Sequence, residues 1–506
     1  MNPHEPESDK LATGTSAPAP APSPTPPPAP VVTADITQDA VVVVPGIMGS
    51  ELYDTVTGKT VWGLSGVSWL LKAWTRPRGL EPLRLTPEEL EGRTGRIKAT
   101  QLMRHSYWTP YLQGFEPYTA LLDVVRSCVA HEAAVLEFAY DWRLPVTANG
   151  RLLAEAARRH LVAWQGHPAH DEARRHRVDE RPARLVFVAH SMGGLVTRAA
   201  LDASYDSDLF DDTRAVLTLG TPFHGAVKAA AILNSGRGTP VPLPHRQLRS
   251  VSATMPGLHD LLPQYACLIE GDDVRRLTPG DVAGIGGDEE LARAAADFQG
   301  KQIHMTLPGH WAVAGTNQAT PQSLTVKDGV VHPRQYGARR HSSGAFIRDA
   351  RGALRFYDVK GDGTVHKDSA AVGPAVTPLP LQHGAVAFDR VALKAVAEVL
   401  RGDDHLGPPQ GAPGCGLDVP DLVTAGEPWT LALTDVDSLS GLKCEIADAE
   451  GRDPRPLRPM WGDGTVVARA TVSAPGLYRV TVRTIDGHTV SQLVLAGEPG
   501  TEQETE

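Results

Sequence analysis

Residues 185–196 have the sequence Leu-Val-Phe-Val-Ala-His-Ser-Met-Gly-Gly-Leu-Val, in which a strand pattern changes within a few residues into a helical one. The first four residues are apolar, as in a buried strand, and good helix formers follow from Leu195. Ala189 and Gly193 flank Ser191, and residues this small permit a sharp turn around the serine. We predict a strand, a tight turn carrying Ser191, and a helix.

A serine in this position is suited to nucleophilic catalysis. The helix that begins after Ser191 directs its positive dipole end and unpaired N–H groups towards the place where an oxyanion would form. The alternative is a serine that only caps the helix, because serine is a preferred N-cap residue. An ordinary cap does not require small residues on both sides, so we favour a nucleophile.

A serine nucleophile needs a histidine and a carboxylate, which in this type of fold follow in the order serine, acid, histidine. The sequence Gly-Asp-Gly-Thr-Val occurs twice and offers Asp362 and Asp463. Asp362 follows the strand-like run Leu354 to Val359 and has histidines downstream in the same domain. Asp463 lies beyond a linker, so we expect it to be a hairpin-turn residue and choose Asp362.

Several histidines compete for the role of base. His383 precedes the helical stretch Ala385 to Leu400, and a loop before the last helix suits the histidine. His366 is the main rival, although it lies only four residues after the chosen acid. His405 falls in the linker, and His190, next to the serine, should point away from it. We therefore predict His383 as the base.

An oxyanion hole needs two backbone donors, one of them from the residue after the serine, here Met192. The second donor comes from a loop after an early strand. The strand-like Val41 to Val44 ends at Pro45 to Ser50, whose glycines permit close backbone approach. Ile47 is the second predicted donor, although such a loop is also common as a plain strand exit.

Short apolar runs alternate with helical patterns through the middle of the chain, which predicts an α/β domain with a mainly parallel sheet. These runs are Ala40 to Val44, Ala134 to Phe138, Leu185 to Val188, Ala215 to Leu219, Trp311 to Ala314 and Leu354 to Val359. After Cys415 the period changes to two, as in a small β-sandwich. The predicted units are a Pro/Ala-rich disordered tail (1–36), a catalytic domain (37–402), a linker (403–413), a β-sandwich domain (414–497) and an acidic tail (498–506).

Composition limits the class of protein. The chain has 506 residues and a net charge of −10, which argues against a nucleic-acid partner. No apolar run is long enough for a membrane span, and the N-terminus lacks the pattern of a secretory signal, so we expect a cytoplasmic protein. The four cysteines are widely spaced, which predicts free buried thiols and no metal site.

Five segments taken in order resemble the lecithin:cholesterol acyltransferase family. They are Pro45 to Leu52, Tyr140 to Arg143, Ala189 to Gly194, Gly220 to Gly225 and Gly361 to Val365. The resemblance implies an α/β-hydrolase fold with cap or lid insertions, no cofactor, and lipid esters as substrates. It also implies a catalytic triad of Ser191, Asp362 and His383, with Ile47 and Met192 forming the oxyanion hole.

The substrate contacts are less determined. Secreted members of the family have a disulfide-stapled lid, but no cysteine occurs between Ser50 and Leu80 here. Trp62 and Trp69 in this region could enter a lipid interface, or could be ordinary core and loop aromatics. Together with Met48 and Phe223 they are our predicted substrate-binding residues. Residues 226–310 should form the cap that shapes the acyl pocket.

The motifs predict serine-dependent acyl transfer or hydrolysis, and the resemblance implies lipid esters as substrates, as in an O-acyltransferase, phospholipase or lipase. The lipid could be met at a membrane surface. Two alternatives stay open: an esterase for small non-lipid esters, whose cleft would be short and polar, and an inactive binding protein that keeps the fold. The second would separate Ser191 from His383. The β-sandwich could bind a protein partner.

Overall fold

The computed structural model describes most of the chain. The described residues are 36–63, 79–104, 118–175, 181–202, 207–237, 243–341, 345–402, 415–420, 422–434, 436, 438–448, 452–462, 465–484 and 489–497. The predicted linker and acidic tail lie outside these ranges, as does the predicted N-terminal tail except for Ile36. The domain boundaries therefore stay predictions.

A six-stranded parallel sheet forms the centre of the α/β part, in the order β15-β10-β7-β6-β1-β5. Its strands are β1 (Ala40–Val44), β5 (Val135–Glu137), β6 (Leu185–His190), β7 (Thr213–Leu219), β10 (Trp311–Gly315) and β15 (Ala375–Leu379). The residues of β1 and β6 are buried throughout, because helices cover both faces of the sheet. The predicted α/β class and five of the six predicted strands are confirmed.

The sixth predicted strand is wrong. Within Leu354 to Val359 only β14 (Phe356–Tyr357) forms, and it pairs with β13 (Gly337–Ala338) in a separate two-stranded ribbon. The sheet instead ends at β15, which contains Pro378. Proline lacks an N–H group and is tolerated at an edge strand, where one side of the backbone has no partner in the sheet.

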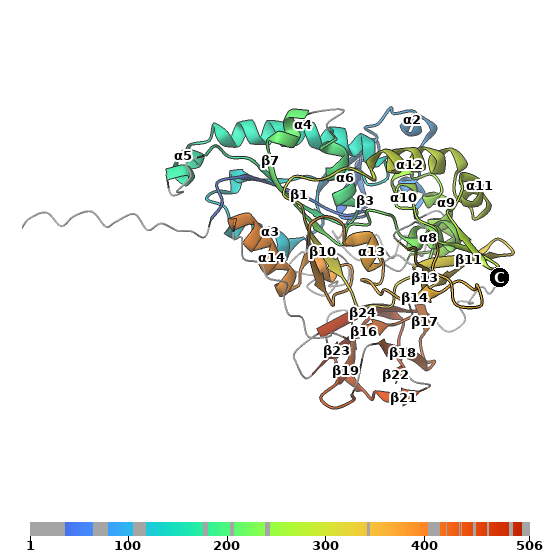
Figure 1. Ribbon diagram of the computed structural model, residues 1–506. Helices are drawn as coiled ribbons and strands as arrows, with labels where there is room; N and C mark the ends of the chain where they lie inside the picture. Colours follow the sequence, from blue (N-terminus) through green and yellow to red (C-terminus); the bar gives the residue numbers. More distant parts are fainter. Residues whose placement is uncertain are drawn as a thin grey trace, which may run out of the picture.

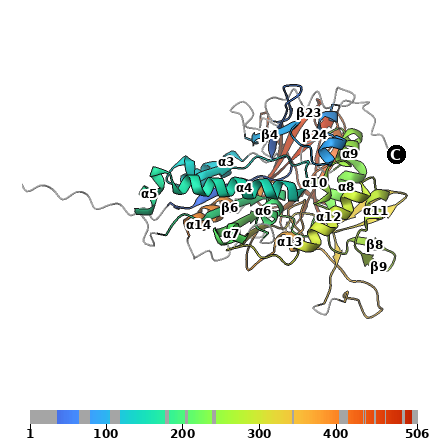
Figure 2. The ribbon, with the colours of Figure 1, turned by 90° about the horizontal axis from the view of Figure 1, so that it is seen from above.

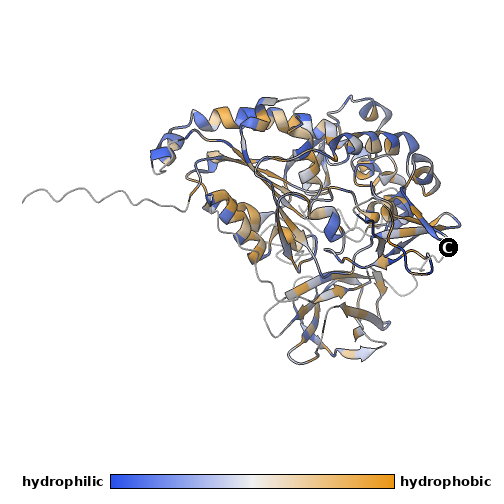
Figure 3. Cartoon of the chain, in the orientation of Figure 1, coloured by the Kyte–Doolittle hydropathy of each residue, from blue (hydrophilic) through white to orange (hydrophobic). Residues whose placement is uncertain are grey.

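Helices cover both faces of the sheet (Figure 1). On one face α4 (Val146–Gln165) packs against α6 (Met192–Ala200), and both contact β1. On the other face α3 (Thr119–Ser127) packs against α14 (Arg390–Arg401). Seen from above, α4 extends along the sheet towards α5 (Figure 2). The apolar colouring of the inner strands beside the polar outer side of α4 shows where the core lies (Figure 3).

An insertion after β7 covers the carboxyl ends of the strands, as predicted for residues 226–310. Its helices are α8 (Val227–Ser235), α9 (His245–Ser252), α10 (Pro256–His259), α11 (Pro279–Gly284) and α12 (Glu289–Gln302). A small sheet in the order β12-β11-β8-β9 adjoins them, with strands β8 (Leu268–Glu270), β9 (Asp273–Arg275), β11 (Ser323–Lys327) and β12 (Val330–Arg334).

Shorter elements complete the described α/β part. The strands β2 (Ser50–Asp54), β3 (Lys59–Trp62) and β4 (Ile97–Leu102) form a three-stranded sheet. The short helices are α2 (Pro87–Leu90), α5 (Pro168–Arg175), α7 (Ser207–Asp211) and α13 (Lys367–Ala370), with 3-10 turns at Glu81–Leu83, Glu132–Ala134 and Ala385–Ala387.

The C-terminal part is a β-sandwich with its own core, as predicted. One sheet has the order β16-β18-β22-β21, with strands β16 (Gly416–Asp418), β18 (Trp429–Thr434), β21 (Met460–Gly462) and β22 (Thr465–Ala470). The other has the order β17-β24-β23-β19-β20, with strands β17 (Leu422–Thr424), β19 (Lys443–Asp448), β20 (Arg455–Leu457), β23 (Gly476–Arg483) and β24 (Thr489–Gly497). Figure 1 shows the sandwich beside β10, β13 and β14.

Two further predictions concern membranes and thiols. Among the described helices, none is both long and apolar enough to span a membrane. All four cysteines are buried and none forms a disulfide, which confirms the predicted state of the thiols. The cytoplasmic location stays a prediction.

Candidate active site

Ser191 occupies the predicted turn between β6 and α6. Its backbone has φ 51° and ψ −126°, a conformation that is rare for residues other than glycine and is found at functional sites. The Ser191 N–H donates to the Leu219 carbonyl oxygen at 2.9 Å, which ties the turn to β7. A Cβ atom at Gly193 would lie 2.5 Å from the carbonyl oxygens of Val44 and Pro45. The small residue beside the serine is therefore required by the close approach of β1.

The three predicted triad residues are brought together by hydrogen bonds. The distance from Ser191 Oγ to His383 Nε2 is 2.8 Å, and the distance from His383 Nδ1 to Asp362 Oδ2 is also 2.8 Å. The Asp362 side chain is fully buried, whereas the His383 side chain is 12% exposed. This geometry lets the Asp362 carboxylate accept the Nδ1 proton while Nε2 accepts the serine proton.

The loop of Asp362 orients its carboxylate independently of the histidine. The Oδ1 atom accepts hydrogen bonds from the backbone N–H groups of Thr364 and Val365, at 2.9 and 2.6 Å. The backbone N–H of His383 donates to the Asp362 carbonyl oxygen at 2.8 Å. The two residues are thus joined by a backbone hydrogen bond as well as by the contact between their side chains. The remaining carboxylate oxygen, Oδ2, is thereby aimed at the imidazole.

The rival residues lie elsewhere or outside the described ranges. His366 is buried against Tyr265, with ring centroids 4.8 Å apart, and burial lowers its pKa to about 4. His190 points away from Ser191, as predicted, because its ring contacts the Tyr118 hydroxyl and the His383 carbonyl oxygen. His405 and Asp463 fall outside the described residues.

Of the two predicted oxyanion donors, Met192 directly follows Ser191 and Ile47 lines the same pocket. Met192 is the first residue of α6, where the backbone N–H has no partner within the helix. The loop of Ile47 is held by two buried tyrosines: the Tyr118 hydroxyl accepts from the Gly46 N–H, and the Tyr140 hydroxyl donates to the Pro45 carbonyl oxygen, each at 2.8 Å. Sequence reasoning missed the role of Tyr118, which lies 72 residues from Gly46.

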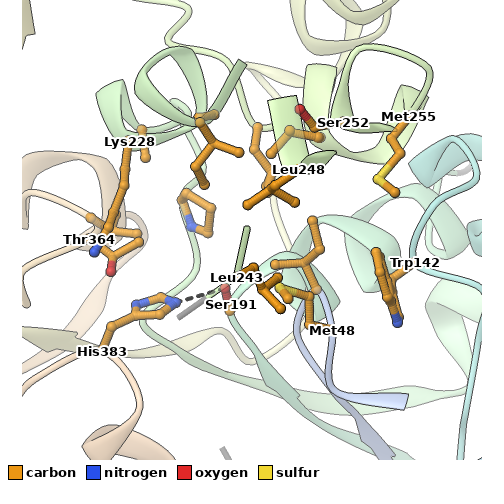
Figure 4. A pocket seen from close by; sticks show the side chains of 18 of the residues that line it. Met48, Trp142, Ser191, Lys228, Leu243, Leu248, Ser252, Met255, Thr364 and His383 are labelled. Carbon is orange, nitrogen blue, oxygen red and sulfur yellow. Dashed lines mark hydrogen bonds between the residues drawn. The ribbon is translucent and has the colours of Figure 1, made fainter. Parts of the chain in front are cut away.

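An apolar pocket of about 130 Å³ opens at the serine. Figure 4 shows the Ser191–His383 hydrogen bond at its base, with Met48 and Trp142 on one side and Lys228 and Thr364 on the other. Most of the lining is hydrophobic and comes from the cap and the first loops, including Ile47, Leu83, Ala226, Ala229, Ile232, Leu243, Leu248, Met255, Leu258 and Leu261.

The predicted substrate-binding residues differ in their position relative to the pocket. Met48 and Trp62 line the pocket, and Trp69 lies outside the described residues. Trp62 is fully buried and donates through Nε1 to the Met48 carbonyl oxygen, which favours the core alternative for this residue. Phe223 is not among the residues that line this pocket and packs against His310, with ring centroids 5.5 Å apart, so its contact with substrate stays a prediction.

Trp142 also lines the pocket; it lies in the segment Tyr140 to Arg143 that carries part of the family resemblance, but it is not among the predicted substrate-binding residues. It packs edge-on against Trp62, with ring centroids 5.5 Å apart. The next residue, Arg143, is fully buried and bonds Asp141 and Glu89 at 2.7 and 3.0 Å. Because a buried arginine needs such partners, this ion cluster fixes the segment that presents Trp142. Among the described residues no group of three or more His, Cys, Asp or Glu side chains could hold a metal ion.

Comparison with known proteins finds one family model that matches part of the chain. The model of the lecithin:cholesterol acyltransferase family matches residues 98–284, a range that contains Ser191 and most of the cap. The chain resembles this family. The resemblance predicted from the sequence motifs is thus confirmed, and the family match supports acyl transfer or hydrolysis on lipid esters. No curated protein matches the chain.

Solved structures of similar proteins are distant. The Tle4–Tli4 complex shares 15% identity over 71% of this chain and 98% of that chain, with a TM-score of 0.43. The mature Bacillus licheniformis lipase BlEst2 shares 12% identity over 75% and 96%, with a TM-score of 0.29. Phospholipase PlaB from Legionella pneumophila shares 10% identity over 91% and 89%, with a TM-score of 0.20.

Proposed function

We propose that the protein transfers acyl groups from lipid esters through a covalent Ser191 acyl-enzyme. The observation that carries this proposal is the pair of 2.8 Å contacts that joins Ser191 to His383 and His383 to Asp362 at the base of an apolar pocket. An imidazole in contact with both a hydroxyl and a carboxylate can activate the hydroxyl as a nucleophile.

The first half of the reaction forms the acyl-enzyme. His383 Nε2 takes the hydroxyl proton as Ser191 Oγ attacks the ester carbonyl carbon, and Asp362 stabilises the resulting imidazolium. The N–H groups of Met192 and Ile47 donate to the oxyanion of the tetrahedral intermediate. Collapse of the intermediate breaks the ester bond, and the protonated His383 delivers its proton to the leaving alcohol oxygen.

The second half releases the acyl group. Water or an acceptor alcohol enters, His383 removes its proton, and the new oxygen nucleophile attacks the carbonyl carbon of the Ser191 ester. Collapse of this second intermediate breaks the bond to Ser191 Oγ, which takes the proton back from His383. Water produces a free fatty acid, whereas an alcohol produces a new ester. Hydrolase and transferase outcomes therefore share every protein group and differ in the second nucleophile.

The pocket favours lipid acyl chains over small polar esters. Burial of apolar substrate surface contributes roughly 25 cal/mol per Å², so a hydrophobic lining discriminates in favour of long acyl chains. The lining from α8, α9 and α10 is mostly apolar, with Lys228 and Ser252 as its polar members. The inactive binding protein would separate Ser191 from His383, and the 2.8 Å hydrogen bond between them argues against it.

The test compares the protein with its Ser191→Ala variant on phospholipid vesicles, with and without an acceptor alcohol, and identifies the acyl products by mass spectrometry. We expect free fatty acid without the alcohol, and no product from the variant. A fluorophosphonate probe should label the parent at Ser191 only. Equal behaviour of the two proteins on vesicles and on short-chain esters would refute the proposal.

A further inference from the structure

The loop after β10 connects the β-sandwich to the acid loop. Gln318 in this loop is 1% exposed. Its side-chain Oε1 accepts the Leu417 N–H at 3.2 Å, and its Nε2 donates to the Cys415 carbonyl oxygen at 3.4 Å. A neighbouring contact joins Thr434 Oγ1 to the Asn317 carbonyl oxygen at 3.2 Å. Strands β16 and β18 of the sandwich thus hold residues 317 and 318.

The backbone of the same glutamine holds the acid loop. The Gln318 N–H donates to the Gly361 carbonyl oxygen at 2.9 Å, and the Gly361 N–H donates back to the Gln318 carbonyl oxygen at 3.2 Å. On the other side of Asp362, the Gly363 N–H donates to Thr320 Oγ1 at 2.8 Å. Both neighbours of Asp362 are therefore bonded to the loop that the sandwich contacts.

The contact between the two parts is specific. A Cβ atom at Gly416 would overlap Thr434 Oγ1 and would lie 2.6 Å from the Asn317 carbonyl oxygen, so only glycine fits in β16 at this point. Asn317 has φ 64°, a left-handed conformation that asparagine adopts more readily than most residues. The glycine at position 416 and the asparagine at position 317 thus suit the backbone where the two parts meet. Such a fit is not expected of two surfaces that touch by chance.

We propose that the β-sandwich is a positioning element of the active site, acting through Gln318 on the loop that carries Asp362. This inference rests on the proposed acyl-enzyme function, because only there does the place of the carboxylate matter for rate. The connection from β16 to the His383 imidazole begins at Gln318, whose side chain bonds Leu417 and whose backbone bonds Gly361. Gly361 directly precedes Asp362, and the Asp362 carboxylate bonds His383. Gln318 is a positioning residue, since it contacts neither the substrate nor the reacting atoms.

The test begins with Gln318→Leu, which keeps the side-chain volume and removes the hydrogen bonds to Cys415 and Leu417. A misplacement of catalytic groups by about 1 Å can cost on the order of 100-fold in rate, so we expect kcat to fall by roughly 10- to 100-fold with little change in KM. Val480→Ala is the matched control. Val480 is fully buried in the sandwich core, so its loss weakens the sandwich without removing a contact to Gln318.

A double-mutant cycle separates positioning from general destabilisation. In an Asp362→Asn background the carboxylate no longer acts, so Gln318→Leu should lower kcat by less than twofold further. If Gln318→Leu does not fold, Thr434→Val takes its place, because it removes the neighbouring bond to the Asn317 carbonyl oxygen. This variant should lower kcat by a few fold when Asp362 is present and by less in the Asp362→Asn background. A kcat within twofold of the parent for a folded variant, or additive losses in the cycle, would overturn the proposal.

One readout does not depend on activity. A histidine Nδ1 proton shared with a carboxylate gives a strongly deshielded ¹H NMR signal. This signal should disappear in Asp362→Asn, weaken or shift in Gln318→Leu, and persist in Val480→Ala. An inactive parent with these spectral responses would refute the acyl-enzyme function while the positioning effect stands. An unchanged signal in folded Gln318→Leu would overturn the positioning proposal.

Discussion

Replacing Asp260 with asparagine should reduce the stability that the protein loses as pH rises from 5 to 8. The carboxylate is fully buried and accepts the N–H of Val146, the first residue of α4, at 2.7 Å. Burial raises the pKa of Asp260 from about 3.8 to about 7. Between these two pH values the unfolded chain has released a proton that the folded chain retains, so the folded state loses stability as pH rises through this window.

The size of the effect follows from the shift. One pKa unit corresponds to about 1.4 kcal/mol, so the full shift costs about 4 kcal/mol above pH 8, and about 2–3 kcal/mol of this cost accrues between pH 5 and pH 8. Asparagine cannot ionise and keeps an oxygen that accepts the Val146 N–H. The stability difference between Asp260→Asn and the parent should therefore grow by about 2–3 kcal/mol from pH 5 to pH 8.

Urea unfolding followed by circular dichroism at the two pH values measures this difference. Burial lowers the pKa of His310 and of His366 to about 4, so these residues favour the folded state increasingly as pH rises from about 4 to 6.5. They are present in both proteins and cancel in the comparison. Asp171→Asn, at an exposed site in α5, is the control. A parent-to-variant difference that stays constant within about 0.5 kcal/mol would refute the reasoning.

Three further changes test the site. Asp362→Asn should lower kcat by roughly 10⁴-fold, as in other serine triads, while KM changes little; steady-state kinetics measure this, and a loss below tenfold would contradict the role of the acid. Gly193→Ala places a Cβ 2.5 Å from the Val44 carbonyl oxygen, so thermal unfolding should show a loss of about 1–3 kcal/mol or more in folding stability. Fluorophosphonate labelling of Ser191 should also fail in this variant. Ala189→Gly is the control and should still be labelled. Ala229→Phe should fill the pocket and shift preference towards shorter acyl chains, and an unchanged profile across esters of graded length would show that this pocket does not hold the chain.

The sequence could predict the parts of the site that depend on local patterns. The turn at Ser191 needs a strand before it, a helix after it and small neighbours, and all three requirements are visible within residues 185–196. Chain order then selected Asp362 over its duplicate and favoured His383. These residues follow one another along the chain in the order that the fold imposes, so no knowledge of long-range contacts was needed.

The missed features depend on contacts between distant segments. No strand was predicted at residues 375–379, where Pro378 is acceptable only because β15 lies at the edge of the sheet. The pocket residues on α9 and α10 belong to helices of eight and four residues, too short for periodicity in the sequence to identify them. Gln318 bonds a residue 99 positions away, and a polar residue in a loop carries no sign of such a partner in its own neighbourhood.

The bond between Gln318 and β16 has a consequence for the order of events during synthesis. Domains generally fold as the chain emerges from its N-terminal end, so Ser191, Asp362 and His383 are all made before Leu417. At roughly 5–20 residues per second, the interval between His383 and Leu417 lasts on the order of seconds. During that interval the nascent chain contains all three proposed catalytic residues and still lacks the strand that holds Gln318. The proposed acyl-transfer activity should therefore reach its full level only after translation has passed into the sandwich.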